Sequence, residues 1–131
     1  MFDWRRPAHL RDGVGVRDGR LAPCKRTPNC VSSQADPADR EHYIAPLAFA
    51  GTIAELRRAL ERLPRVKVIR EESDYLYAEF RTPLMRYVDD VEFLRAGSVL
   101  HVRSASRLGR RDFGVNRGRV EKLRELIRAI R

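Results

Sequence analysis

The sequence predicts an α+β fold, a two-layer sandwich in which an antiparallel sheet of about five strands carries two helices on one face. Four consecutive segments between residues 66 and 104 have the β-rich or alternating composition of strands and are separated by short turns. One amphipathic helical pattern precedes this meander and another follows it. Helices that flank an antiparallel meander in this order are typical of two-layer α+β domains.

The chain is predicted to form one domain, because 131 residues leave no room for two independent cores. Residues 1–20 have no sustained periodicity and are rich in glycine, aspartate and arginine, so we expect an irregular N-terminal segment. Residues 21–131 then form the single α+β domain. The segment 42–50 has β composition but contains Pro46, which restricts it to an edge strand or an extended arm.

Two helices are predicted from apolar stripes and boundary residues. Thr52 and Glu55 form a T-x-x-E capping box, and Pro64 ends the first helix. The second helix is expected to start near Asn116, a favourable N-cap residue. The apolar stripes are Ile53, Leu56, Leu60 and Leu63 in the first helix, and Val120, Leu123, Ile127 and Ile130 in the second.

The four strands of the meander are expected at residues 66–70, 75–81, 87–93 and 99–104. For the last hairpin, a turn centred between Ala96 and Gly97 predicts the register. It places apolar residues opposite apolar residues and acids opposite bases. The predicted pairs are Phe93 with Leu100, Val91 with Val102, Glu92 with His101, and Asp90 with Arg103.

The formal net charge is +9, and it is concentrated in the two ends of the chain around a nearly neutral middle. A basic surface attracts phosphates, acidic lipids, nucleic acids or acidic proteins. Only three of the 27 basic residues are lysines, an excess of arginine that a GC-rich genome would also produce. Nucleic acid is not favoured as a partner, because the aromatic residues are not interleaved with the arginines.

Cys24 and Cys30 are the only cysteines, and their C-x5-C spacing leaves three interpretations open: a local disulfide, two inert thiols or, as a minor alternative, a metal-binding or catalytic role. We expect no metal site and no cofactor, because the three histidines are far apart in the sequence. No apolar run is long enough for a membrane span. Because the chain as written shows no secretory leader, a cytoplasmic location is expected, and an envelope or periplasmic one if the chain was trimmed.

The connection between the last strand and the last helix, residues 103–119, is the main candidate site. It contains six arginines and three glycines close to a helix start, a combination that suits an anion. In the structural alternative, the same arginines pair with aspartates and fix the loop to the sheet. The candidate ligand-binding residues are Arg103, Ser104, Ser106, Arg107, Asn116 and Arg117, with Asp89 and Asp90 orienting the arginines.

Three motifs identify a family resemblance. Residues 21–33 contain L-A-P-C and T-P-N-C-V-S-S, residues 88–93 read V-D-D-V-E-F, and residues 103–121 contain R-S-A-S-R, D-F-G-V-N-R and R-V-E. In this order and over residues 21 to about 125, they resemble the uncharacterised domain-of-unknown-function family 1499. The resemblance implies no established activity. Its members are bacterial and plastid, and several resemble exported, membrane-anchored or lipid-anchored proteins.

The sequence therefore predicts a binding module for a small anionic ligand or an acidic partner, acting as a monomer or weak dimer. One alternative is a hydrolase or transferase that uses Asp89, Asp90 and His101, or a Cys24 thiol. In it, His101 would form an acid–base pair with Glu92. The other alternative is a structural or interaction protein without a pocket.

Overall fold

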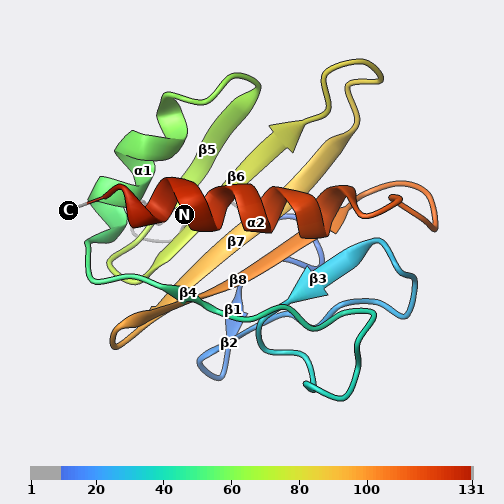
Figure 1. The fold of residues 1–131 in the computed structure, drawn as a ribbon, viewed down its shortest axis with the longest axis horizontal. Helices are drawn as coiled ribbons and strands as arrows, with labels where there is room; N and C mark the ends of the chain where they lie inside the picture. The colour runs from blue at the N-terminus through green and yellow to red at the C-terminus, as the bar shows by residue number, and fades with distance from the viewer. Residues whose placement is uncertain (1–9, 131) are drawn as a thin grey trace, which may run out of the picture.

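The computed structural model describes residues 10–130, and its main sheet has the strand order β3-β8-β7-β6-β5 (Figure 1). All pairs along this path are antiparallel. The strands are β3 Cys30–Ser32, β5 Val66–Glu71, β6 Tyr75–Arg81, β7 Val88–Ala96 and β8 Val99–Ser106. A short strand, β4 Leu47–Ala48, pairs with the start of β8, so β3 and β4 share its outer edge. The α+β prediction is confirmed.

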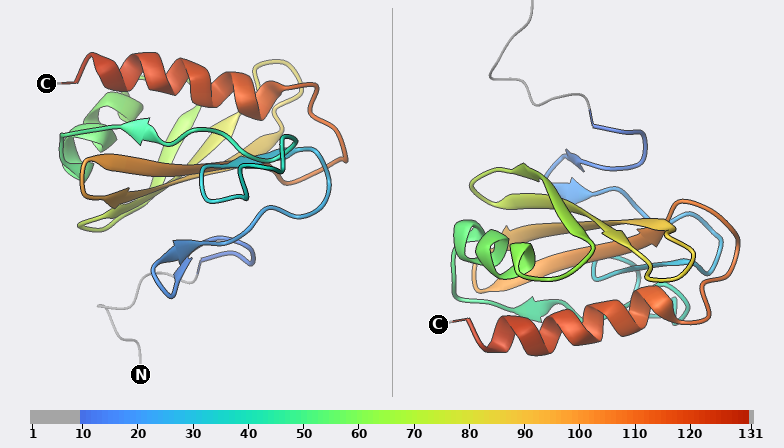
Figure 2. Two further views of the ribbon diagram at one scale, coloured as in Figure 1. Left: turned by 60° about the horizontal axis from the view of Figure 1, so that its bottom comes forward. Right: turned by 90° about the horizontal axis from the view of Figure 1, so that it is seen from above.

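The two helices, α1 Ile53–Glu61 and α2 Val115–Arg128, cover the same face of the sheet (Figure 2). A hairpin of β1 Val16–Arg17 and β2 Arg20–Leu21 lies on the other face. This hairpin lies largely in the segment 1–20, which was expected to be irregular. Residues 1–9 of that segment lie outside the described residues. Within residues 10–130, no helix is both long and apolar enough to cross a membrane.

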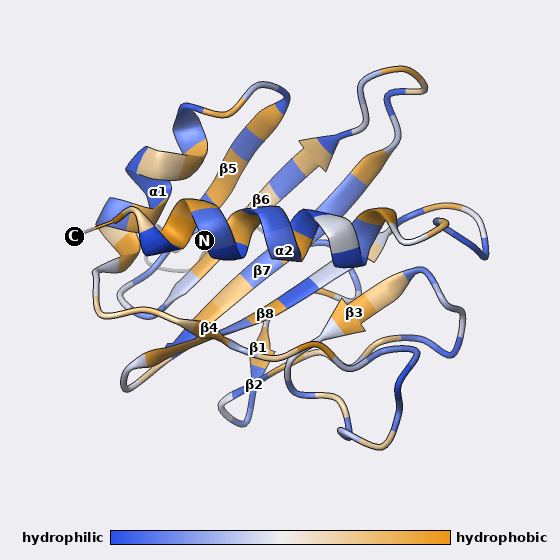
Figure 3. Cartoon of the chain, viewed as in Figure 1, coloured by the Kyte–Doolittle hydropathy of each residue, from blue (hydrophilic) through white to orange (hydrophobic). Residues whose placement is uncertain are grey.

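The core lies between the sheet and the helices, where apolar positions alternate with polar ones along the strands (Figure 3). Fully buried side chains from every layer meet there: Leu47, Leu56, Leu60, Leu76, Phe93, Leu100, Val102 and Val120. The capping box of α1 is confirmed, since the Glu55 amide donates to Thr52 Oγ1 and the Thr52 amide donates to Glu55 Oε1.

The predicted start of α2 is wrong by two residues. Gly114 is the N-cap, with the left-handed φ of +81° that glycine adopts easily, and Asn116 lies within the first turn. Asp112 supplies the capping oxygens: its carboxylate accepts hydrogen bonds from the amides of Gly114 and Asn116, at 2.9 and 3.0 Å. The Asn116 side chain is thereby free to form long-range contacts.

The predicted register of the last hairpin is also wrong, by two residues. Phe93 lies opposite Val102 and Glu92 lies opposite Arg103, because Gly97 and Ser98 alone form the turn. Gly97 has a φ of +62°, which a tight turn of this kind requires. Because side chains alternate with a period of two, this shift leaves every residue on the predicted face and changes only its partner.

Candidate functional site

The sheet separates the predicted site residues onto two faces. Asp89 pairs with Ser106 and lies on the helix-covered face, whereas Asp90 pairs with Ala105 and lies on the opposite face. Ser104 and Arg103 are divided in the same way. The structure therefore brings together Asp89, Ser104, Ser106 and Asn116 on one side, and Asp90, Arg103 and Arg107 on the other.

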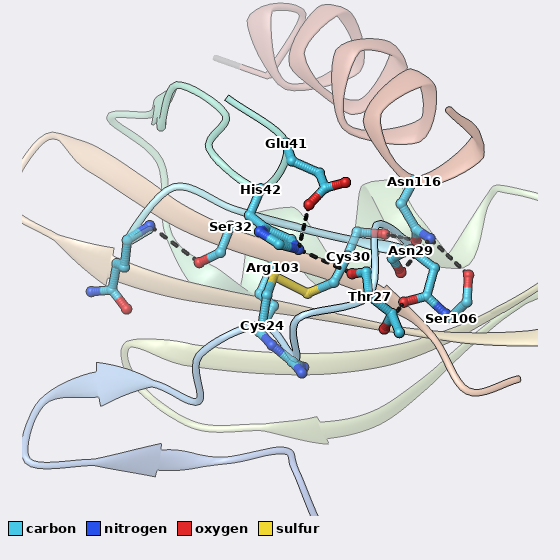
Figure 4. Close-up of a disulfide and its surroundings, with 12 residues drawn as sticks. Cys24, Thr27, Asn29, Cys30, Ser32, Glu41, His42, Arg103, Ser106 and Asn116 are labelled. Carbon is cyan, nitrogen blue, oxygen red and sulfur yellow. Dashed lines mark hydrogen bonds and ion pairs between the residues drawn. A yellow bond between two sulfur atoms is a disulfide. The ribbon is translucent and has the colours of Figure 1, made fainter. Parts of the chain in front are cut away.

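On the helix-covered face, Asn116 is fully buried and its side chain joins three parts of the chain (Figure 4). Its amide nitrogen donates to the Asn29 carbonyl at 3.2 Å, to Ser106 Oγ at 2.8 Å and to Asp112 Oδ2 at 2.7 Å. Its amide oxygen accepts from Ser104 Oγ at 2.6 Å and from an Arg119 nitrogen at 2.7 Å. This cluster fixes α2 to the end of β8 and to the cysteine loop, and we call it the Asn116 clasp.

Asp89 completes the clasp with an ion pair to Arg119, whose Nη2 lies 2.7 Å from Asp89 Oδ2. That oxygen makes no well-directed hydrogen bond, so the contact is mainly electrostatic. Burial raises the pKa of Asp89 above its ordinary value, and the nearby Arg119 guanidinium only partly opposes the increase. The Arg119 guanidinium also stacks on Phe80, 5.3 Å from the ring centre.

On the opposite face, two carboxylates form a ladder of buried polar contacts. Glu92 has no exposed surface and accepts hydrogen bonds from Tyr75 at 2.5 Å, from the Gly15 amide at 2.7 Å and from Arg103 at 3.2 Å. Burial raises the pKa of Glu92, and these three donors oppose the rise.

The second carboxylate of this ladder, Asp90, accepts a hydrogen bond from Tyr77 at 2.5 Å and two from Arg107 Nε, at 3.1 and 3.2 Å. Arg107 also bonds Glu79 at 2.6 Å. These hydrogen bonds hold the pKa of Arg107 above its ordinary value, against the effect of burial. Arg107 is therefore committed to two carboxylates.

A cavity of about 280 Å³ lies beside this ladder, between the N-terminal segment and the end of β8. Arg103 and Arg107 line it together with Lys25. The buried Nε of Arg103 has no hydrogen-bond partner among the described residues. However, Arg103 and Arg107 already face Glu92, Asp90 and Glu79, so little positive charge remains for an anion.

The structure separates the remaining predicted residues. Arg117 donates from the exterior of α2 to the backbone carbonyls of Arg40 and Glu41, at 3.2 and 3.3 Å. His101 lies 3.0 Å from Ser33 Oγ and four positions along β8 from the residue that pairs with Asp90. Burial, together with the charge of Arg20, lowers the pKa of His101. Asp89, Asp90 and His101 thus do not form one cluster.

The cysteine loop is closed by a disulfide between Cys24 and Cys30, with Cα atoms 5.7 Å apart (Figure 4). No Cys24 thiol is available in this state. The loop packs against the end of β8, where the Asn29 side chain donates to the Gly109 carbonyl at 2.7 Å.

His42 connects the cysteine loop to the segment that follows it. Its Nε2 lies 3.0 Å from the Thr27 carbonyl, and its Nδ1 lies 2.8 Å from Asp39. Burial disfavours the charged ring, but these acceptors outweigh burial and raise the pKa of His42. Asp39, Glu41 and His42 could together approach a metal ion. However, both ring nitrogens of His42 already face acceptors, which favours a structural ion pair.

A groove of about 450 Å³ lies between α2 and the β5–β6 pair, and we call it the basic groove. Its cations come from β6, from α2 and from the loop before β5, and none of the described residues that line it is acidic. The cationic residues are Arg65, Arg81, Arg119 and Lys122, and the main apolar ones are Val66, Phe80, Leu123 and Leu126.

Gly118 explains why the groove is open along α2. A Cβ built on this residue would meet no atom within 4 Å, so the missing side chain leaves empty space. The sequence prediction missed this site because Arg65, Arg81 and Lys122 are far apart in the chain. The available signal was a glycine in a helix interior, which is unfavourable by about 1 kcal/mol relative to alanine.

The chain belongs to the family described as "Protein of unknown function (DUF1499)", whose model matches residues 20–127. The resemblance inferred from the three motifs is thus confirmed. No curated protein and no solved structure shows a significant match to the chain. The family motifs coincide with the cysteine loop, the Asp89–Glu92 part of β7 and the Asn116 clasp.

Proposed function

We propose that this domain is a binding module for a small amphiphilic anion, held in the basic groove with its anionic group at the rim and its apolar part on the floor. This proposal keeps the predicted ligand class and moves the site from the Arg103–Arg107 region, on the face of the sheet opposite the helices, to the helix-covered face beside α2. The observation that carries it is the surplus of positive charge over an apolar floor.

The charge at the rim is not neutralised within the protein. Arg65, Arg81 and Lys122 are exposed and form no ion pair with any residue in the range 10–130, whereas Arg119 is paired with Asp89. An anionic group at the rim would therefore meet three unpaired cations. By contrast, the arginines beside the smaller cavity are matched by buried carboxylates.

The floor of the groove explains why the ligand should also be apolar. Leu63, Val66 and Leu126 are only partly buried and offer hydrocarbon surface, and a volume of about 450 Å³ lies within the usual range of small-molecule sites. Burial of an alkyl chain contributes about 0.8 kcal/mol per methylene group. A simple inorganic anion would leave this surface exposed to water.

Decanoate is a suitable probe, with decanol and acetate as controls that carry only the chain or only the charge. We expect calorimetry to show decanoate binding and thermal denaturation to show stabilisation, with both controls much weaker. Gly118→Leu should abolish binding by filling the groove without lowering stability, because leucine is a good helix former. Unchanged decanoate affinity in Gly118→Leu would overturn the proposal.

A matched pair of variants tests whether decanoate binding requires a positive charge at the rim of the groove. Lys122→Gln removes a cation from the rim, whereas Lys67→Gln removes the same charge from an exposed position on β5 outside the groove. We expect only Lys122→Gln to weaken decanoate binding. Equal effects of the two variants would indicate attraction by net charge alone and would refute a defined site.

The disulfide bears on where such a module would act. Disulfides persist in oxidising compartments and are rare in the cytosol. The closed Cys24–Cys30 pair therefore supports an envelope or periplasmic location over the cytoplasmic one. Free-thiol titration of the protein isolated from that compartment, without reductant, should give no reactive thiol.

A further inference from the structure

Large apolar side chains are exposed at the end of the molecule where α2 begins. Leu84 is 90% exposed and Phe113 is 93% exposed, which are unusual values for residues of this size in a folded domain. Of the eight large apolar residues exposed within the described residues, five belong to the β6–β7 loop and the β8–α2 connection, and a sixth is the first residue of α2. They are Leu84, Met85, Tyr87, Leu108, Phe113 and Val115, and we call this surface the apolar end.

The two segments project from the same end of the domain. Figures 1 and 2 show the β6–β7 loop and the β8–α2 connection at the end of the domain where α2 begins. Pro83 of the β6–β7 loop and Val115 at the start of α2 line the same groove. The exposed residues therefore lie at one end of the domain and not on a flat face of the sheet.

The apolar end is also basic. Arg86, Arg110 and Arg111 lie in these segments, and none forms an ion pair with a residue described by the structure. The single acid there, Asp112, is occupied in capping α2 through the amides of Gly114 and Asn116. A partner of this surface must therefore accept apolar side chains and provide negative charge.

The backbone holds two of these residues in an unfavourable conformation. Phe113 and Arg86 have φ values of +53° and +55°, in the left-handed region that residues other than glycine rarely adopt. A bulky aromatic residue that combines this backbone with an exposed ring gains no compensating burial within the chain. Backbone strain of this kind clusters at functional positions, which agrees with a contact outside the protein.

We infer that the apolar end docks on the surface of an anionic lipid bilayer. Loop tips that carry leucine, methionine and aromatic residues insert between lipid headgroups, and neighbouring arginines pair with the lipid phosphates. A protein partner would need a concave apolar pocket with an acidic rim for each protruding loop. A bilayer surface accommodates both loops at once.

Sedimentation of the full chain with vesicles tests the inference, using phosphatidylcholine with about one-third phosphatidylglycerol and, separately, phosphatidylcholine alone. We expect binding to the anionic vesicles, at least tenfold weaker binding to the neutral ones, and at least a tenfold loss for the double variant Leu84→Ser/Phe113→Ser. Ile69→Ser removes an exposed apolar residue on β5 and should bind like the wild type.

The arginines are tested with a pair of double variants that lower the net charge equally. Arg110→Gln/Arg111→Gln should weaken vesicle binding several-fold, whereas Arg58→Gln/Arg128→Gln, on the exposed sides of the two helices, should not. If wild-type protein does not bind anionic vesicles, or if the two double variants lose binding equally, the inference fails.

A probe at Phe113 distinguishes insertion from simple adhesion. The described residues contain no free cysteine, so Phe113→Cys can be labelled at one site with an environment-sensitive fluorophore while the disulfide stays closed. Vesicles should shift its emission to the blue, and a label at Arg58→Cys should not respond. Vesicle binding without a shift at position 113 would assign the contact to another surface.

Discussion

Replacement of Asn116 by alanine is the sharpest test of how the buried polar residues at the start of α2 contribute to stability. The substitution removes five hydrogen bonds at once and leaves the hydroxyl of Ser104, which has no exposed surface, without its acceptor. An unsatisfied buried group is unfavourable by about 1–3 kcal/mol, and the small void adds to it. We expect the free energy of unfolding to fall by about 3 kcal/mol.

In a domain of this size, such a loss lowers the melting temperature by about 10 °C. Urea titration with thermal denaturation should measure it, and Arg117→Ala is the control. Arg117 is adjacent in sequence but bonds only two backbone carbonyls at the surface, so its loss should change stability by about 0.5 kcal/mol or less. If Asn116→Ala changed the free energy of unfolding as little as Arg117→Ala does, the stabilising role of the clasp would be refuted.

Three further changes test other parts of the structure. Opening the Cys24–Cys30 disulfide with reductant should destabilise the protein by about 2 kcal/mol in chemical denaturation, as expected for so short a closed loop, and Cys24→Ser/Cys30→Ser should match it. Because the folded pKa of His42 is raised, its stabilisation is complete below its unfolded value of 6.5 and disappears as pH rises through the folded value. The melting-temperature difference between wild type and His42→Asn should therefore be larger at mildly acidic than at alkaline pH, and a constant difference would contradict the assignment. Thr52→Ala should reduce the free energy of unfolding by about 1 kcal/mol through loss of the α1 cap, and an unchanged urea midpoint would count against the capping box.

The elements whose signals are local could be predicted from the sequence. The Thr52–Glu55 capping box depends on residues three positions apart, and the apolar stripe of α1 needs only its own periodicity. The faces of the last hairpin were also predictable, since alternation survives a register error of two. The pairing partners were not predicted correctly, because the predicted turn lay one residue before the actual turn at Gly97 and Ser98.

The start of α2 shows why a good local signal can fail. Asn116 is a favourable N-cap residue in isolation, but its amide is the group that reaches the Asn29 carbonyl and Ser104. These contacts span up to 87 residues of sequence, so nothing near Asn116 indicates them. Asp112 then takes over the cap, and Gly114 provides the left-handed backbone that this geometry requires.

The division of the candidate site could have been foreseen by the same alternation that gave the strand faces. Asp89 and Asp90 are consecutive strand residues, as are Arg103 and Ser104, so each pair must point to opposite sides of the sheet. The basic groove could not have been predicted in this way, because Arg65, Arg81 and Lys122 converge only after α1, β6 and α2 pack together. Strand order and helix placement are tertiary facts that no single segment determines.

The location of unpaired charge follows from burial. Arg103, Arg107 and Arg119 lie in the most arginine-rich stretch, yet each is partly or largely buried and is matched by carboxylates, because a buried charge without a partner is strongly destabilising.

The surplus charge is therefore left to exposed positions that no fold requirement neutralises, on the rim of the basic groove and on the apolar end. These two surfaces meet at Pro83 and Val115, but they can be disabled separately. Gly118→Leu fills the groove and leaves both loops intact, so vesicle binding should persist in this variant even when decanoate binding is lost. Leu84→Ser/Phe113→Ser should have the opposite effect, since neither residue lines the groove. Loss of both activities in either variant would mean that groove and loops form one site, and the two proposals would then have to be replaced by one.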